Sequence, residues 1–380
     1  MPSTSRPQDE FRARLERARA SGLLPLDLAV ADPERCGLGW DRDELEALSG
    51  AAAPARGSRA AALAGAREAI ASYLAGHRAS VQPDRIFFAP SRGVARRLAL
   101  ESACDPDDEV LAPAPARPFV EPEDAEAARL RKYALEFGET WQIDRRSLRR
   151  AVGPRTRAVA IGNPSEPTGA MPGDDGIAFL DELCGAHGLA LLGDEAFIET
   201  GPGPSASVAR ATRCVAVHVS GLAGVCGLPQ LGGEWIAVAG PDALAAHAAS
   251  RASARAEAGP GASDSALRAI PALLARRERF LTPLRARLAR NRGAIAKAAL
   301  REAPWTLQWG SGGWWAVLQI NPVRHETELC LALLDEGVAV LPGHLDGLPE
   351  EGYLVVSLLP DPDVFTQGLE RLEAHLRRLA

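Results

Sequence analysis

The sequence predicts an α/β fold, with a doubly wound, mostly parallel sheet and a smaller α+β domain. From about residue 85, short apolar runs alternate with helix-like stretches, which is the pattern of a parallel sheet covered by helices on both faces. The stretch Ala272–Leu300 is apolar at a spacing of three to four residues, with arginines between, and predicts one long helix. Strands and helices then follow in a different order, which indicates a second domain.

The predicted strands of the large sheet are short apolar runs between helical or turn-like segments. A helix-like stretch follows the first of them as far as Cys104, and Gly176–His187 is an amphipathic helix. The six strands expected are Arg85–Ala89, Glu109–Ala112, Arg157–Gly162, Leu189–Gly193, Cys214–Ser220 and Trp235–Ala239.

The last part of the chain predicts the smaller domain. We expect strands at Trp314–Ile320, Val338–Leu341 and Tyr353–Leu358, with helices at Glu326–Glu336 and Asp363–Leu379. The N-terminal segment is charged and helical in pattern, and we expect it to join this domain. The predicted domains are therefore 46–284 for the large one and 1–45 plus 285–380 for the small one.

Charge and hydropathy exclude several classes of partner. The 380 residues carry a formal net charge of −6, whereas nucleic acids and anionic membranes need a basic face. No apolar run is long enough to span a membrane, and the N-terminus lacks the apolar core of a signal peptide. We expect a cytoplasmic protein that binds neither nucleic acid nor membrane.

The six cysteines are widely scattered and form no CxxC pair. A disulfide framework or a zinc site needs closer, regular spacing. We therefore expect free, buried thiols and no metal site.

Four local patterns follow one another along the chain: Asn163-Pro-Ser-Glu-Pro-Thr-Gly169, Gly193-Asp-Glu-Ala-Phe197, the loop Ser220–Leu231, and Gly312-Gly-Trp-Trp315. In this order they resemble the fold-type I, PLP-dependent aminotransferase family (class I/II). Upstream of them, Leu26–Pro33 is similar to the family's opening segment. The resemblance covers nearly the whole chain and implies the aspartate aminotransferase-like fold, PLP chemistry and a homodimer with pockets at the subunit boundary.

Most residues that the family uses to hold PLP are replaced in this sequence. The resemblance places the Schiff-base lysine on Gly224. The one PLP-binding residue of the family that is retained is Asp194, the partner of the pyridine nitrogen. The hydroxyl residue before the lysine falls on Ala223, and the phosphate-binding cation falls on Gly232. The phosphate-binding Ser/Thr falls near Arg92 and Gly93, and the aromatic residue that stacks on the ring falls on Arg117. The asparagine of the turn falls on Glu166, and the tyrosine that would bond the phenolic oxygen of PLP falls on Phe197.

The missing lysine is not displaced by a few positions. The chain has only Lys132 and Lys297, and neither lysine nor arginine occurs between Arg213 and Arg251. Compositional drift from lysine would give arginine rather than glycine. A Schiff base cannot form without the amine, so the resemblance implies a member that lacks the family's covalent chemistry.

The charged residues that remain allow more than one interpretation. Asp194 either still holds a cationic ring or pairs with a nearby arginine or a backbone amide. Glu166 and Arg117 either pair and fill the old pocket, or bind a polar ligand, or supply acid–base chemistry. His218, on an apolar strand, is more simply a core residue, and His344 is a weak candidate on a small-domain loop.

The sequence predicts a pseudo-aminotransferase that has lost PLP-dependent transamination and been repurposed. A biosynthetic pathway is one setting in which it could act. No cofactor is expected, except PLP bound non-covalently. The alternatives are a lysine-independent enzyme that uses some of Glu166, Asp194, Arg117 and His218, and an enzyme that binds PLP or PMP non-covalently. The expected partners are a second copy of the chain, and either a small polar ligand or an active paralogue.

Overall fold

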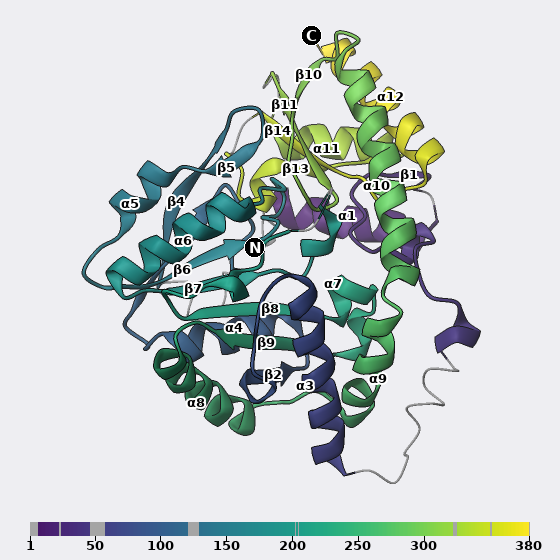
Figure 1. Ribbon diagram of the computed structural model, residues 1–380. Helices are drawn as coiled ribbons and strands as arrows, with labels where there is room; N and C mark the ends of the chain where they lie inside the picture. The colour runs from purple at the N-terminus through teal and green to yellow at the C-terminus, as the bar shows by residue number, and fades with distance from the viewer. Residues whose placement is uncertain are drawn as a thin grey trace, which may run out of the picture.

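The computed structural model describes residues 7–22, 24–45, 58–120, 129–201, 203, 205–321, 325–349 and 352–379. They form a large α/β unit and a smaller unit, connected by the long helix α10 (Glu278–Ala299), as Figure 1 shows. The fold class predicted from the sequence is confirmed. The proposed domain boundary at residue 46 lies outside the described residues, so the domain limits stay a prediction.

The large unit contains an eight-stranded sheet in the order β2-β9-β8-β7-β6-β3-β4-β5. β9 runs antiparallel to β2 and β8, β5 runs antiparallel to β4, and the remaining neighbours pair in parallel. The strands are β2 (Ile86–Ala89), β3 (Glu109–Ala114), β4 (Leu130–Phe137), β5 (Trp141–Ile143), β6 (Thr156–Gly162), β7 (Ala190–Asp194), β8 (Ala216–Gly221) and β9 (Glu234–Ala239).

Both faces of this sheet are apolar because successive side chains of a strand point to opposite faces. In β2, Phe87 and Ala89 belong to the buried cluster of one face, and Ile86 and Phe88 to the cluster of the other. One face is covered by α4 (Arg92–Ala103) and α8 (Asp242–Ala258), and the other by α3 (Arg59–Gly76), α6 (Gly173–His187), α7 (Leu222–Cys226) and α9 (Asp264–Ala275). The short helix α5 (Arg145–Ala151) packs against β4.

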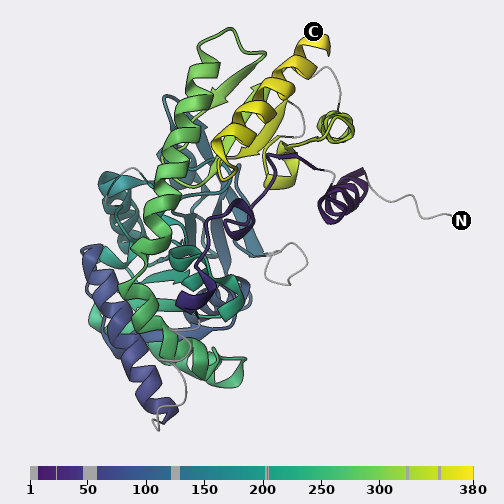
Figure 2. The ribbon, with the colours of Figure 1, turned by 90° about the vertical axis from the view of Figure 1, so that its right-hand side faces the viewer.

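The smaller unit contains an antiparallel sheet in the order β10-β11-β14-β13. The N-terminal segment belongs to this unit, because β1 (Leu26–Asp27) forms a separate parallel pair with β12 (Val338–Ala339) and α1 (Pro7–Ala20) contacts α11 (Glu326–Asp335), as Figure 2 shows. Its other elements are β10 (Trp305–Gln308), β11 (Trp315–Ile320), α11 (Glu326–Asp335), β13 (Leu341–Pro342), β14 (Tyr353–Ser357) and α12 (Pro362–Leu379).

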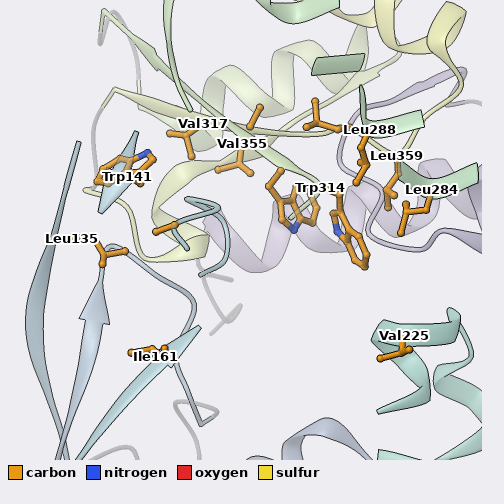
Figure 3. Packing of buried hydrophobic residues seen from close by; sticks show 14 of the residues in the cluster. Leu135, Trp141, Ile161, Val225, Leu284, Leu288, Trp314, Val317, Val355 and Leu359 are labelled. Carbon is orange, nitrogen blue, oxygen red and sulfur yellow. The ribbon is translucent and has the colours of Figure 1, made fainter. Parts of the chain in front are cut away.

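One apolar cluster extends through both units (Figure 3). Trp314 and Val355 come from the small unit, Leu284 and Leu288 from α10, and Ile161 from β6. Burying each side chain of this size contributes about 1.5–3 kcal/mol. Val355, on β14, is fully buried in this cluster.

The prediction of one long helix over Ala272–Leu300 is wrong. α9 ends at Ala275 and α10 begins at Glu278, with Arg276 at φ −112° and ψ 10° between them. α9 lies along α3, whereas α10 runs toward the small unit (Figure 1). The apolar spacing continues across the break, so periodicity alone could not reveal it. None of the described helices is long and apolar enough to cross a membrane.

Candidate functional site

The candidate site lies where the parallel strands end at their carboxyl termini. Asp194 is the last residue of β7 and pairs with Gly162 of β6 and Val219 of β8. Arg92 is the first residue of α4, directly after the N-cap Ser91, and so faces the same edge of the sheet. Ligand sites of doubly wound sheets occupy this edge.

Asp194 is a buried carboxylate held by two guanidinium groups. Its side chain is 3% exposed. Arg92 Nε lies 2.9 Å from Oδ2 and 3.1 Å from Oδ1, and Arg96 Nε also donates to Oδ2. The backbone N–H of Ala196 donates to Oδ1 at 3.3 Å. Asp194, which the resemblance assigns to the cofactor ring, therefore already has hydrogen-bond partners within the chain.

Glu166 links this group to the small unit. Its carboxylate accepts from Arg92 Nη1 at 3.1 Å, from Arg117 Nη1 at 3.3 Å and from Trp315 Nε1 at 3.1 Å. Arg117 Nε also donates to Asp346 at 2.5 Å. Three guanidiniums and three carboxylates thus form one arginine–carboxylate network, which consists of Arg92, Arg96, Arg117, Glu166, Asp194 and Asp346.

Aromatic rings hold two of these guanidiniums in place. Arg92 lies over the Phe197 ring at 4.6 Å, and Arg117 lies over the Trp315 ring at 4.9 Å. The Phe197 ring in turn packs on Trp314, with 4.2 Å between ring centroids. Cation–π contacts of this kind are favourable, particularly where water is excluded. The network is therefore fixed by rings of both units.

The network holds its acids and bases in their charged forms. Burial alone would raise the pKa of Asp194, but the charges of Arg92 and Arg96 outweigh it and hold that pKa well below its usual range. The pKa of Glu166 is lowered in the same way, since Arg92 and Arg117 outweigh its burial. Burial would lower the pKa of Arg92, and the charges of Asp194 and Glu166 raise it instead. Groups ionised so firmly are poor proton donors or acceptors at neutral pH.

Little free space is left beside the network. The cavity lined by Arg92, Arg117, Glu166 and Asp194 has a volume of about 20 Å³, room for roughly one water molecule. The interpretation in which Glu166 and Arg117 pair and fill the pocket agrees with this geometry.

The loop that carries the lysine in the family has no room for a side chain at that position. A Cβ added at Gly224, in α7, would lie 3.0 Å from the Ala196 Cα and closer still to the Ala196 carbonyl oxygen. Gly232 has φ +63°, where a β-carbon is strained, and an added Cβ would lie 2.9 Å from the Pro90 carbonyl oxygen. Gly93, in contrast, has open space around it.

Glu234 is the site residue that sequence reasoning missed. Its carboxylate fills the space beside Gly221, accepts from the Ala223 N–H at 3.1 Å and is 2% exposed. Its Oε2 has no hydrogen-bond partner among the described residues. Burial raises the pKa of Glu234 to about 7. The sequence feature that could have revealed it is the position of an acidic residue directly before the apolar run Trp235–Ala239.

Glu234→Gln is expected to change how stability depends on pH. The folded-state pKa of Glu234, about 7, lies above the ordinary value of 4.5, so the wild type loses stability as pH rises from 4.5 to 7. The loss amounts to about 3 kcal/mol, because one pKa unit corresponds to about 1.4 kcal/mol. Urea unfolding should show the variant to be more stable than wild type at pH 8 and similar near pH 4.5.

Glu136→Gln serves as the control for this variant, because it removes an exposed carboxylate from β4. It should leave the pH profile as in the wild type. If the Glu234 variant also keeps that profile, Glu234 is not a buried, titrating acid.

The two histidine candidates lie outside the arginine–carboxylate network. His218 Nδ1 lies 2.6 Å from Glu195 and 3.5 Å from the Ser207 hydroxyl, and its side chain is 1% exposed. His344 Nδ1 lies 3.1 Å from Glu326. The structure brings together Glu166, Asp194, Arg117, Arg92 and Phe197, whereas His218 belongs to the core.

Comparison with known proteins identifies the family. The pattern described as "Aminotransferase class I and II" matches residues 55–372. The chain belongs to this family. It is 39% identical over 57 residues to the aspartate aminotransferase of Geobacillus stearothermophilus, which covers 15% of this chain and 14% of that protein. It is 28% identical over 100 residues to the glutamate-pyruvate aminotransferase AlaA of Escherichia coli, which covers 26% and 25%. The aligned stretches therefore span a quarter or less of these two relatives.

Solved structures of aminotransferases share the fold over nearly the whole chain. The alanine aminotransferase of Pyrococcus furiosus has a TM-score of 0.84 at 19% identity and covers 99% of this chain and 98% of its own. A single mutant of the Thermus thermophilus aspartate aminotransferase has a TM-score of 0.79 at 22% identity and covers 98% and 97%. At these identities the likeness shows the fold alone.

Family membership corrects the expectation that no cofactor is bound. The relatives are PLP-dependent aminotransferases, so PLP is the cofactor to be expected. The residues present do not allow PLP to form a Schiff base at this position. Gly224 has no side-chain amine, and Ala196 packs so closely against it that no side chain would fit. Lys132 on β4 and Lys297 on α10 are both exposed and belong to other elements. Asp194 has the right chemistry for a ring cation, but Arg92 and Arg96 occupy it.

Within the part of the chain that the structure describes, no group of three or more His, Cys, Asp or Glu side chains could hold a metal ion. All six cysteines are free thiols, and five of them are buried.

Proposed function

We propose that this member of the aminotransferase family does not carry out lysine-dependent transamination. The observation that supports this most directly is the packing at Gly224, where the Ala196 carbonyl leaves no room for a side chain. A displaced lysine would still need space to reach the crevice, and this loop offers none. The covalent step that the family uses therefore has no residue to perform it.

PLP, the cofactor expected from the family, would be held here without a covalent bond. The resemblance assigns Asp194 as the partner of its ring nitrogen, and a ring there would have to displace the Arg92 guanidinium. The group would bring its electron-withdrawing ring to the crevice when bound. The chain's own residues would supply charge and stacking, through Arg92, Phe197 and Trp314.

Lysine-independent acid–base chemistry by Glu166 and Asp194 is the weaker candidate. The lowered pKa values of both carboxylates keep them ionised at neutral pH, and each is bonded to two arginines. A role in supporting an active paralogue agrees better with a crevice that ion pairs hold closed, because the free volume there is about 20 Å³. A homodimer, as expected from the family, stays a prediction that size-exclusion chromatography with light scattering would check.

An aminotransferase assay tests the proposal. The protein is incubated with saturating PLP, alanine, aspartate or glutamate as amino donor, and 2-oxoacid acceptors. We expect amino-group transfer no faster than with PLP alone, while the E. coli relative, assayed in parallel, turns over. Enzyme-dependent turnover of about 1 s⁻¹ or more, in the range usual for enzymes, would overturn the proposal.

A further inference from the structure

A second cavity lies apart from the arginine–carboxylate network and has the chemistry of an anion site. It has a volume of about 410 Å³ and is lined by residues from the C-terminal end of α3, the loop after β7 and the start of α10. None of its lining residues belongs to the network. The lining residues that carry the argument are Tyr73, His77, Glu199, Arg277 and Arg285.

Three basic side chains converge here on one carboxylate. Glu199 lies 2.7 Å from Arg285 Nη2, 3.3 Å from His77 Nε2 and 3.6 Å from Arg277 Nε. Arg285 has a second acidic partner, Glu278 at 2.9 Å, whose side chain is 55% exposed. Although burial alone would lower the pKa of His77, the hydrogen bond to Glu199 raises it. With His77 protonated, the three bases carry one positive charge more than Glu199 and Glu278 offset. Glu195, whose charge also raises the pKa of His77, lies 2.6 Å from His218 Nδ1.

Two hydrogen-bond donors of this pocket have no acceptor among the described residues. Tyr73 is 5% exposed and its hydroxyl is unpartnered. The Nε of Arg277 is likewise buried without a hydrogen bond, and its guanidinium lies 5.5 Å from the centroid of the Tyr73 ring. Burial raises the pKa of Tyr73 well above its usual value, so the hydroxyl stays a donor. Buried donors normally have a hydrogen-bond partner, and leaving one without a partner is unfavourable.

We propose that this pocket binds a small oxyanion, such as a carboxylate or phosphate group of a small molecule. The oxyanion accepts from the Tyr73 hydroxyl and the Arg277 guanidinium and offsets the excess charge around Glu199. Charge-assisted hydrogen bonds to arginine are the strong ones for this purpose. The volume is in the range of small-molecule sites. The inference does not depend on the proposed function, because no residue of the crevice takes part.

Equilibrium dialysis with sulfate tests the site, with sodium chloride used to hold the ionic strength constant. Sulfate keeps its charge between pH 6 and 8, so any pH dependence belongs to the protein. We expect saturable binding of one sulfate per chain that weakens as pH rises and His77 loses its proton. Arg277→Gln should weaken binding tenfold or more, and Tyr73→Phe, which removes only the hydroxyl, about tenfold.

Arg279→Gln is the matched control, since it removes the same charge two residues away. Arg279 pairs at the surface with Glu44 and its side chain is 57% exposed. This variant should bind sulfate as the wild type does. No saturation below about 10 mM sulfate, or an equal loss in Arg279→Gln and Arg277→Gln, would overturn the site. If Arg277→Gln fails to fold by circular dichroism, Tyr73→Phe decides the question alone.

Discussion

Gly224→Ala is expected to destabilise the protein by about 3 kcal/mol, at the upper end of what overpacking usually costs. The added methyl group would overlap the carbonyl group of Ala196, two residues after β7, and Ala196 cannot move without disturbing Asp194, because its N–H donates to the Asp194 carboxylate. Urea unfolding followed by circular dichroism measures the change. For the same reason Gly224→Lys should be unstable and should not regain transamination.

Gly293→Ala provides the matched control for this substitution. Gly293 also lies in a helix, α10, but an added Cβ would meet nothing within 4 Å. Alanine there should stabilise by about 0.5–1 kcal/mol, because glycine is a poor helix former. If Gly224→Ala proves as harmless as Gly293→Ala, the loop has room for a side chain and the proposed function loses its main support.

Asp194→Asn is expected to cost about 3–5 kcal/mol, since it removes one partner of a buried ion pair and leaves Arg92 and Arg96 without their shared carboxylate. Asp174→Asn is the control. Asp174 also pairs with two arginines, Arg78 and Arg210, but its side chain is 56% exposed. Exposed ion pairs contribute little to stability, so this variant should unfold much as the wild type does. Urea unfolding of both variants at pH 7 measures the difference.

The pH dependence of the Asp194 effect is a further check. Because the folded-state pKa of Asp194 lies below its unfolded value, the stability it contributes is complete above about pH 4 and is lost as pH falls further. The gap between wild type and Asp194→Asn should therefore stay constant from pH 5 to 8 and shrink only in acid. A cost below 1 kcal/mol at pH 7 would mean that Asp194 is not bonded to the arginines in solution.

Much of the fold was predictable because its determinants are local. The buried strands are apolar runs such as Arg157–Gly162, observed as β6 (Thr156–Gly162), and the turn Asn163–Gly169 follows it. β4 and β5 were missed, since β4 (Leu130–Phe137) carries exposed charged residues and lies near the sheet edge. The pairing of β1 with β12 joins residues from opposite ends of the chain, which no local pattern reveals.

The site was predictable only in part. The absence of a lysine at position 224 and the charges at Glu166 and Arg117 are visible in the sequence, and the structure pairs Glu166 with Arg117. Their other partners are not visible, since Asp346 lies 229 positions from Arg117 and Trp315 lies 149 from Glu166. The step from missing side chains to a missing cofactor was wrong, because family membership makes PLP the expected cofactor. The missing residues bear on whether PLP would be attached covalently, and not on whether PLP is the cofactor.

The measurement that tests the central claim most directly is a crystal structure of the protein grown with PLP. The account predicts no covalent link between PLP and any atom of the chain, with the Gly224 Cα packed against the Ala196 carbonyl. Continuous electron density between the cofactor and a lysine of the chain, with the ring bonded to Asp194, would contradict it.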